Sequence, residues 1–178
     1  IVNYDNMKII LQKSNLFAIH IVGKIIQTIG GKEFPPKRKK TYNLIQSIFF
    51  NNFNNKTLGN VNIFRKNNEI YFLREQRNIN LNVEIKKDKL YIFDGRFLII
   101  SKKSGYLISS SGNDSKSISN LNPFFKYKDI INNTIPHLQT LEGTRIKPHL
   151  NQMNMNSVLN IKSNNKPFGL YLMNRVLV

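Results

Sequence analysis

Residues 90–100 read LYIFDGRFLII, in which two short apolar runs flank an Asp-Gly pair. Asp-Gly between apolar runs is typical of a two-residue hairpin loop, because both loop positions then adopt positive φ at little cost. We therefore predict antiparallel strands at residues 90–93 and 97–100, and a further strand at residues 106–109. On the N-terminal side, apolar residues recur at the spacing of strands, at Val61, Ile63, Ile70, Phe72, Val83 and Ile85.

Before residue 51 the apolar residues follow a helical period instead. Residues 15–29 predict an amphipathic helix whose polar face carries His20, Lys24 and Gln27. Ser14 is a suitable N-cap, and Gly30-Gly31 tolerates the positive φ that often ends a helix. The apolar face of this helix consists of Ala18, Ile21, Val22, Ile25 and Ile29.

A second helix is predicted to begin near Pro36, because proline fits the first turn of a helix, where its missing N–H needs no partner. It should run to about Phe50. The side chains expected to face the core are Tyr42, Ile45, Ile48 and Phe49.

These patterns predict an α+β fold, with an N-terminal helical pair followed by a mainly antiparallel sheet and one or two short helices. One short helix is expected at residues 124–131. We assign residues 1–52 to a helical subdomain and residues 53–150 to a mainly antiparallel β domain. Residues 151–178 form a tail without an assignment.

The chain is strongly basic, with 27 Lys and Arg against 10 Asp and Glu among 178 residues and a formal net charge of +17. This imbalance favours a polyanion partner, above all a nucleic acid, because cations that neutralise phosphates release condensed counterions. The alternative interpretation is a basic surface that is only solvated.

The candidate RNA-binding residues are led by a run of cations in the first turn of the second helix, Lys37, Arg38, Lys39 and Lys40. Positive charge there opposes the helix dipole, whereas a phosphate would be held by the side chains and the free N–H groups together. Tyrosines at strand spacing could stack on bases, although such residues more often pack in a core. The further candidate cations are Lys56, Arg65, Arg74 and Arg96, and the tyrosines are Tyr42, Tyr71, Tyr91 and Tyr106.

No catalytic, metal or cofactor site is expected in this chain. The absence of cysteine excludes thiolate catalysis and Cys-type zinc sites. Residues 109–115 are similar to the phosphate loop of ATP pyrophosphatases but lack its second Gly, so a flexible turn is expected. Glu84 and Lys86 have the spacing of metal-dependent nucleases without the partner Asp. The histidines, His20, His137 and His149, are isolated.

Five short motifs follow one another along the chain. They are TIGGKEFPPKR at 28–38, KTLGN at 56–60, FLRE at 72–75, IFDGRF at 92–97, and TIPHL at 134–138 continuing through PHL at 148–150. Their order and spacing resemble the region of bacterial tRNA(Ile)-lysidine synthetases that follows the catalytic domain. Phe93 stands where Trp is common in that family, and Asn60 stands where Gly is usual.

The resemblance implies a role in tRNA modification. The complete enzyme uses ATP to adenylate the wobble cytidine of the CAU anticodon of tRNA(Ile), and lysine then displaces AMP, which changes decoding from AUG to AUA. ATP and lysine bind in an N-terminal domain whose motifs are absent here, and which is expected in cis or as a separate chain. The present chain would grip the tRNA.

Other features agree with this expectation. The apolar stretches are far shorter than the roughly 20 residues of a membrane helix, so a cytoplasmic protein is expected. The first residue is not Met and no signal-peptide pattern follows, which we interpret as an internal start. A stand-alone RNA-binding or ribosome-associated module without catalysis is the alternative, and a nuclease is a third hypothesis.

Overall fold

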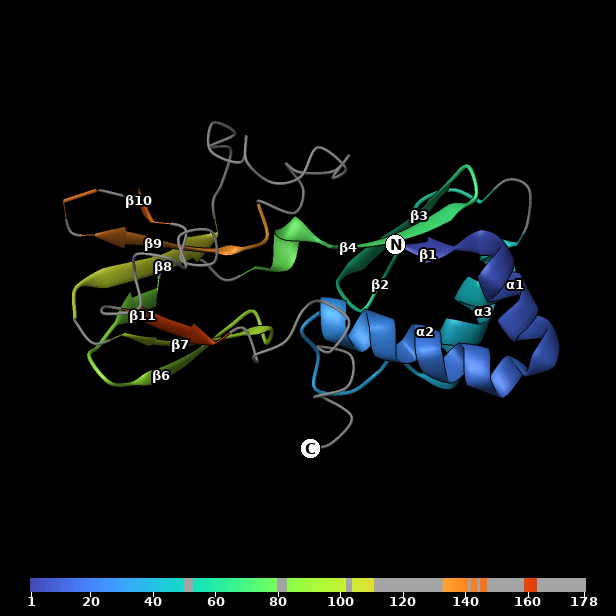
Figure 1. Cartoon of the computed structure of the whole chain (residues 1–178), viewed down its shortest axis with the longest axis horizontal. Helices are drawn as coiled ribbons and strands as arrows, with labels where there is room; N and C mark the ends of the chain where they lie inside the picture. Colours follow the sequence, from blue (N-terminus) through green and yellow to red (C-terminus); the bar gives the residue numbers. More distant parts are fainter. Residues whose placement is uncertain are drawn as a thin grey trace. The chain divides into compact units, whose positions relative to one another are not determined.

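The computed structural model describes residues 1–49, 53–79, 83–101, 104–110, 133–140, 142–143, 145–146 and 159–162. The fold is α+β, as predicted: helices dominate the start of the chain, and the described strands pair in antiparallel sheets (Figure 1). The chain divides into two compact units, the first covering residues 1–75 and the second beginning at Gln76.

The first unit combines helices with one sheet. The helices are α1 (Tyr4–Lys13), α2 (Asn15–Ile29) and α3 (Arg38–Ile48). The sheet has the order β1-β4-β3-β2, and every neighbouring pair is antiparallel. Its strands are β1 (Val2–Asn3), β2 (Lys56–Leu58), β3 (Val61–Lys66) and β4 (Glu69–Arg74).

Helix α2 begins and ends where the sequence predicts. The Ser14 hydroxyl accepts a hydrogen bond from the amide of Phe17, and Gly31 has a φ of 64° just after the last turn. The placement of Gln27 on the polar face was wrong, because its side chain is buried. Its Nε2 donates to the carbonyl of Glu33 at 2.5 Å, so the amide ties the next segment to the helix.

Helix α3 is confirmed, and its predicted core residues Ile45 and Ile48 are buried, but the placement of Tyr42 in the core was wrong. Tyr42 is 40% exposed and does not face the core, whereas Thr41 and Leu44 are buried. Thr41 Oγ1 donates to the carbonyl of Lys37, so this polar residue is satisfied inside the helix. The prediction placed Tyr42 in the core because its side chain is large and apolar. The orientation of the helix instead turns the neighbouring Thr41 inward.

Helix α1 was not predicted. Its N-cap is Asn3, whose side chain accepts a hydrogen bond from the amide of Asn6 at 3.0 Å, and Asp5 in the first turn complements the dipole. Met7 is its one buried residue, and Tyr4, Ile10 and Leu11 are partly buried against the same core. These residues recur at helical spacing, a signal that the prediction did not use.

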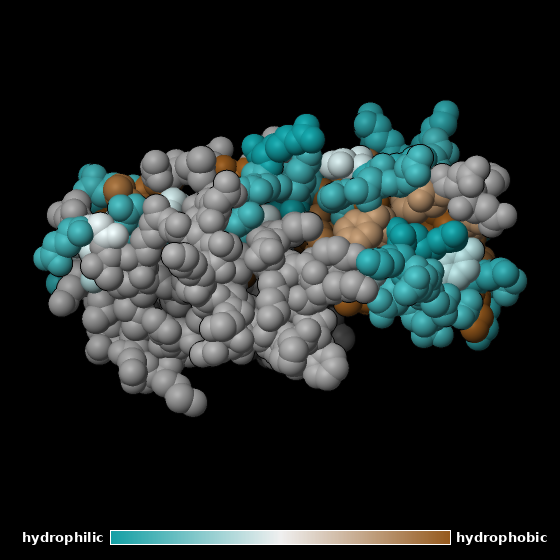
Figure 2. All heavy atoms as spheres, turned by 90° about the horizontal axis from the view of Figure 1, so that it is seen from above, coloured by the Kyte–Doolittle hydropathy of each residue, from teal (hydrophilic) through white to brown (hydrophobic). Residues whose placement is uncertain are grey.

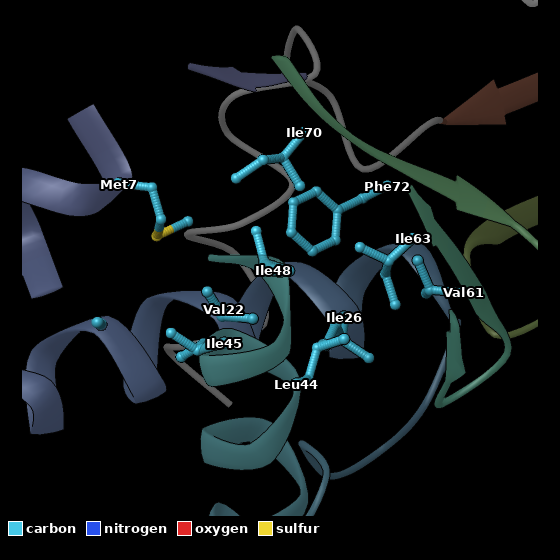
Figure 3. Close-up of a cluster of buried hydrophobic side chains, with 11 residues drawn as sticks. Met7, Val22, Ile26, Leu44, Ile45, Ile48, Val61, Ile63, Ile70 and Phe72 are labelled. Atoms are coloured by element: carbon cyan, nitrogen blue, oxygen red, sulfur yellow. The ribbon is translucent and has the colours of Figure 1, made fainter. Parts of the chain in front are cut away.

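The core of the first unit lies between the helices and one face of the sheet. Figure 3 shows Ile26 and Leu44 pointing from α2 and α3 toward the side chains of Val61, Ile63 and Phe72 on β3 and β4. On each strand these inward residues are two positions apart, as the pleat requires. Burial of large aliphatic side chains, each worth about 1.5–3 kcal/mol, holds the two layers together.

The second unit is built mainly from strands. One sheet has the order β10-β9-β8-β5 and the other β11-β7-β6, with all described pairs antiparallel. Both sheets contribute to one core, since Ile85, Ile108 and Leu138 come from the first and Phe93 and Ile99 from the second. The elements are η1 (Gln76–Asn78), β5 (Val83–Ile85), β6 (Leu90–Phe93), β7 (Phe97–Ser101), β8 (Tyr106–Ser110), β9 (Pro136–Thr140), β10 (Arg145–Ile146) and β11 (Leu159–Lys162).

The predicted hairpin is confirmed, with one difference in its loop. Asp94 and Gly95 have φ of 53° and 63°, and the amide of Arg96 donates to the carbonyl of Phe93. Strand pairing begins at Phe93 and Phe97, so Arg96 is a third loop residue. Its guanidinium group bonds to Asp94 and to the carbonyl of Thr134, which gives the extra residue a structural role.

The division of the chain differs from the predicted boundary between residues 52 and 53. Strands β2 to β4 pack against the helices and share their core, which places them in the first unit. Within the predicted tail, β11 pairs with β7. The predicted helix at 124–131, residues 111–115 of the phosphate-loop candidate, and His149 lie outside the described residues. Among the described helices, none is long and apolar enough to cross a membrane.

Two glycines bring the end of α2 against the turn between β2 and β3. A Cβ on Gly30 would overlap the carbonyl oxygen of Gly59 and would lie 2.8 Å from the carbonyl oxygen of Ile26. Gly23, earlier in α2, has room for a methyl group, since the nearest atom is the Cβ of Pro35 at 3.6 Å.

We predict opposite effects of alanine at these two glycines. Gly30→Ala should lower the free energy of unfolding by about 3 kcal/mol, because backbone has to move to admit the methyl group. Gly23→Ala should raise it by up to about 1 kcal/mol, because alanine is the better helix former. Urea denaturation followed by circular dichroism measures both, and equal midpoints for the two variants would contradict the close approach.

Candidate nucleic-acid interface

The predicted cation run lies at the start of α3. Lys37 is the N-cap residue and makes no side-chain cap, and Arg38, Lys39 and Lys40 fill the first turn, which contains no acidic residue. All four side chains are exposed. The helix dipole and the four cations both create a positive potential at this end of α3. An anion would be favoured there.

A pocket of about 230 Å³ lies beside this run. Its cationic wall consists of Lys32, Lys37 and Lys40. Its apolar lining includes Ile26 of α2 and Leu58 of β2, and the exposed ring of Phe34 stands at its border with Pro36. Segments from three parts of the sequence thus meet around one cavity.

The segment between α2 and α3 is fixed by hydrogen bonds to the end of α2. The amide of Lys32 donates to the carbonyl of Gln27 at 3.0 Å, and the Gln27 side chain donates to the carbonyl of Glu33. Two hydrogen bonds, at Lys32 and at Glu33, therefore connect the loop that carries Phe34 to the end of α2. These hydrogen bonds fix the backbone of two residues, Lys32 and Glu33, next to the end of α2.

The turn between β2 and β3 closes the opposite side of the pocket. Gly59 and Asn60 both have positive φ, 58° and 65°. The buried guanidinium group of Arg74 donates to the carbonyls of Asn60 at 3.0 Å and Glu75 at 2.7 Å, and the amide of Glu75 also donates to Asn60. Arg74 therefore clamps the turn from the end of β4.

Three of the predicted RNA-binding residues have partners inside the protein. Arg74 is 4% exposed. Arg65 donates to the carbonyl of Ile48 at the end of α3 and lies 4.9 Å above the ring of Tyr4. Arg96 pairs with Asp94 at 2.6 Å. Charge in the sequence did not distinguish these residues from surface cations.

The other predicted cations are exposed in the first unit. Lys56 lies on β2, two residues before Leu58 and so on the same face of that strand as this pocket residue. Together with the run from Lys37 to Lys40, it forms what we call the basic rim. Figure 2 shows hydrophilic side chains over much of the described surface of this unit, with apolar patches between them.

The tyrosines mostly pack inside the units. Tyr71 is buried and stacks on its cross-strand partner Phe64, with ring centroids 5.0 Å apart and planes 4° apart. Tyr91 and Tyr106 pack against the second core. Tyr42 is the exception, exposed on α3 one helical turn from Arg38.

The alternative catalytic motifs gain no partners among the described residues. Glu84 and Lys86 are exposed at β5 and its end, and no three acidic or histidine side chains gather as metal ligands in the part of the chain that the structure describes. His20 is exposed, and His137 is buried with Nδ1 3.1 Å from the carbonyl of Ile135.

Of the residues that line the pocket, only Lys37 and Lys40 were among the predicted site residues. Lys32, Phe34 and Gln27 were part of sequence patterns, but their convergence depends on the fold. One signal was available: Phe34 stands in a short segment between Glu33 and Pro35, where no helix or strand could bury its ring.

Comparison with known proteins adds no relative. No family model, no curated protein and no solved structure matches this chain. The observations themselves define a basic α+β protein with a cation-lined pocket in its first unit.

We predict that Arg74 stabilises the folded protein through its hydrogen bonds, and that its charge does not serve RNA binding. Arg74→Met should lower the free energy of unfolding by about 2–4 kcal/mol, because two bonds from a charged donor are lost and the Glu75 carbonyl is left without that partner. Lys39→Met, which removes the same charge from the surface, should change it by less than about 0.5 kcal/mol. Denaturant unfolding of both variants measures this, and similar losses would refute the clamp.

Proposed function

We propose that this chain is the tRNA-binding portion of a tRNA(Ile)-lysidine synthetase. The observation that carries the proposal is that the first three motifs of the resemblance, far apart in sequence, meet at one place. Gly30 of the first motif lies against Gly59 of the second, and Arg74 of the third bonds to Asn60. The residues that carry these three motifs therefore take part in one local arrangement of the first unit.

The later motifs are also joined. Arg96, in the Asp-Gly hairpin motif, donates to the carbonyl of Thr134, the first residue of the fifth motif. Phe93, which replaces the common Trp of the family, is buried in the second core beside Phe97. An aromatic residue thus fills this core position in the present chain as well.

The departure at Asn60 has a physical explanation that supports the proposal. The family usually carries Gly there, and Asn60 has a φ of 65°. Asparagine is, after glycine, among the residues that adopt this conformation most readily. Asparagine at this position thus retains the positive φ that a glycine would adopt.

In this proposal the basic rim supplies the electrostatic part of tRNA binding. Lysines and Arg38 around the start of α3 contact phosphates, which positions the tRNA without reading its sequence. The catalytic domain, in cis or as a separate chain, supplies ATP and lysine sites and performs the adenylation and lysine transfer. The present chain holds the tRNA so that its anticodon reaches that domain in the cytoplasm.

We expect the purified chain to bind tRNA(Ile) with a CAU anticodon more tightly than an unrelated tRNA or a DNA duplex of similar size. Affinity should fall steeply with salt for all three, because counterion release drives the phosphate contacts. A salt series of binding titrations provides the measurement. Equal affinity for the three nucleic acids would favour a stand-alone basic RNA-binding module, and absence of binding at low salt would remove both functions.

Charge reversal in the first turn of α3 should separate binding from stability. Lys39→Glu is expected to raise the free energy of unfolding by about 0.3–1 kcal/mol, because an acidic residue complements the helix dipole. The same change should weaken tRNA binding and reduce the slope of log affinity against log salt by about 1 or more. Thermal unfolding and the salt series test the two effects, and unchanged tRNA affinity would remove Lys39 from the interface.

A further inference from the structure

The pocket in the first unit has the chemistry of an anion site with an adjacent apolar surface. Among the described residues that line it, three are lysines and none is acidic. Neither the Lys37 nor the Lys40 side chain forms a hydrogen bond or an ion pair with the described part of the chain. Their ammonium groups are therefore available to a phosphate at the mouth of the pocket.

Phe34 gives the pocket its second chemical feature. Its side chain is 73% exposed, although the ring borders a cavity lined by Ile26 and Leu58. An exposed phenylalanine contributes little to folding, because burial of its ring is what would stabilise the protein. Beside lysines, however, an accessible aromatic face is a platform on which a nucleic-acid base stacks.

The size of the pocket limits what it holds. A volume of about 230 Å³ is below the roughly 300–1,000 Å³ of pockets that enclose drug-sized ligands. A base pair in a helix is excluded, since its bases remain stacked on their neighbours. A single unstacked base, with its own phosphate outside on the lysines, matches both the size and the mixed lining.

Gln27 adds a polar group at the wall of the pocket. Its Oε1 is buried and has no hydrogen-bond partner among the residues that the structure describes, whereas its Nε2 is occupied by Glu33. A buried acceptor without a partner is costly. Because this oxygen has almost no accessible surface, a base in the pocket would reach it only after the Gln27 side chain moves.

We propose that this pocket receives one unstacked nucleotide of the bound RNA, with its phosphate on Lys37 and Lys40 and its base against Phe34. The inference rests on the proposed function only in taking RNA as the partner. It assigns a local, single-stranded contact to the first unit, in addition to the general attraction of the basic rim. Loops and unpaired ends of a folded RNA are where such a nucleotide is found.

Binding of the full chain to tRNA(Ile) and to a DNA duplex tests the proposal, with variants at two exposed phenylalanines. Phe34→Leu should weaken tRNA binding on the order of tenfold without changing the salt slope, because stacking is lost and charge is not. Phe34→Tyr should bind like the wild type, since it keeps the aromatic face. Phe17→Leu is the matched control, as Phe17 is 58% exposed on α2 and does not line the pocket.

The duplex separates a base contact from a general loss of binding. Its bases stay stacked, so Phe34→Leu should leave duplex affinity unchanged, and unfolding midpoints should be equal for all variants. Equal tRNA affinities for the wild type and Phe34→Leu would overturn the nucleotide pocket while leaving tRNA binding by the basic rim intact. A parallel loss on tRNA and duplex would overturn it as well, whereas a wild type that binds neither would overturn the proposed function itself.

Discussion

The proposed interface depends on the contact between the backbones of Gly30 and Gly59. With no side chain between them, the end of α2 lies directly against the turn between β2 and β3. The segment after α2 must then pass beside that turn, and α3 begins next to Leu58 with its cations facing solvent. Arg74 fixes the same turn from the side of β4 through its bonds to the carbonyls of Asn60 and Glu75.

In the proposed function, the start of α3 gives up some stability in order to bind an anion. Arg38, Lys39 and Lys40 stand in a helical turn where acidic residues are favourable, and no side chain caps the helix. The cost of each misplaced charge is a few tenths of a kcal/mol, which the aliphatic core beneath it offsets easily. A bound phosphate reverses the sign of the effect, because the side chains and the free N–H groups then share a counter-charge.

Local signals in the sequence predicted α2 and the Asp-Gly hairpin, since a cap, a period and a pair of positive-φ residues all act within a few positions. Features set by tertiary contacts were missed or misassigned. Tyr42 and Thr41 differ by one helical position, and only packing decides which is buried. The pocket escaped prediction because its walls come from α2, the following loop and the turn at Gly59.

Apart from Arg38, which is exposed at the start of α3, the candidate arginines and lysines lie in different surroundings, which a count of charges could not reveal. Arg65, Arg74 and Arg96 bond to backbone carbonyls inside the protein, while every described lysine among the candidates is exposed. A guanidinium group is planar, weakly hydrated and carries five donors, so it can satisfy several buried carbonyls at once, whereas an ammonium group is strongly hydrated and stays at the surface. In this chain Arg65, Arg74 and Arg96 therefore maintain the architecture, and the proposed contact with RNA falls to Arg38 and the exposed lysines.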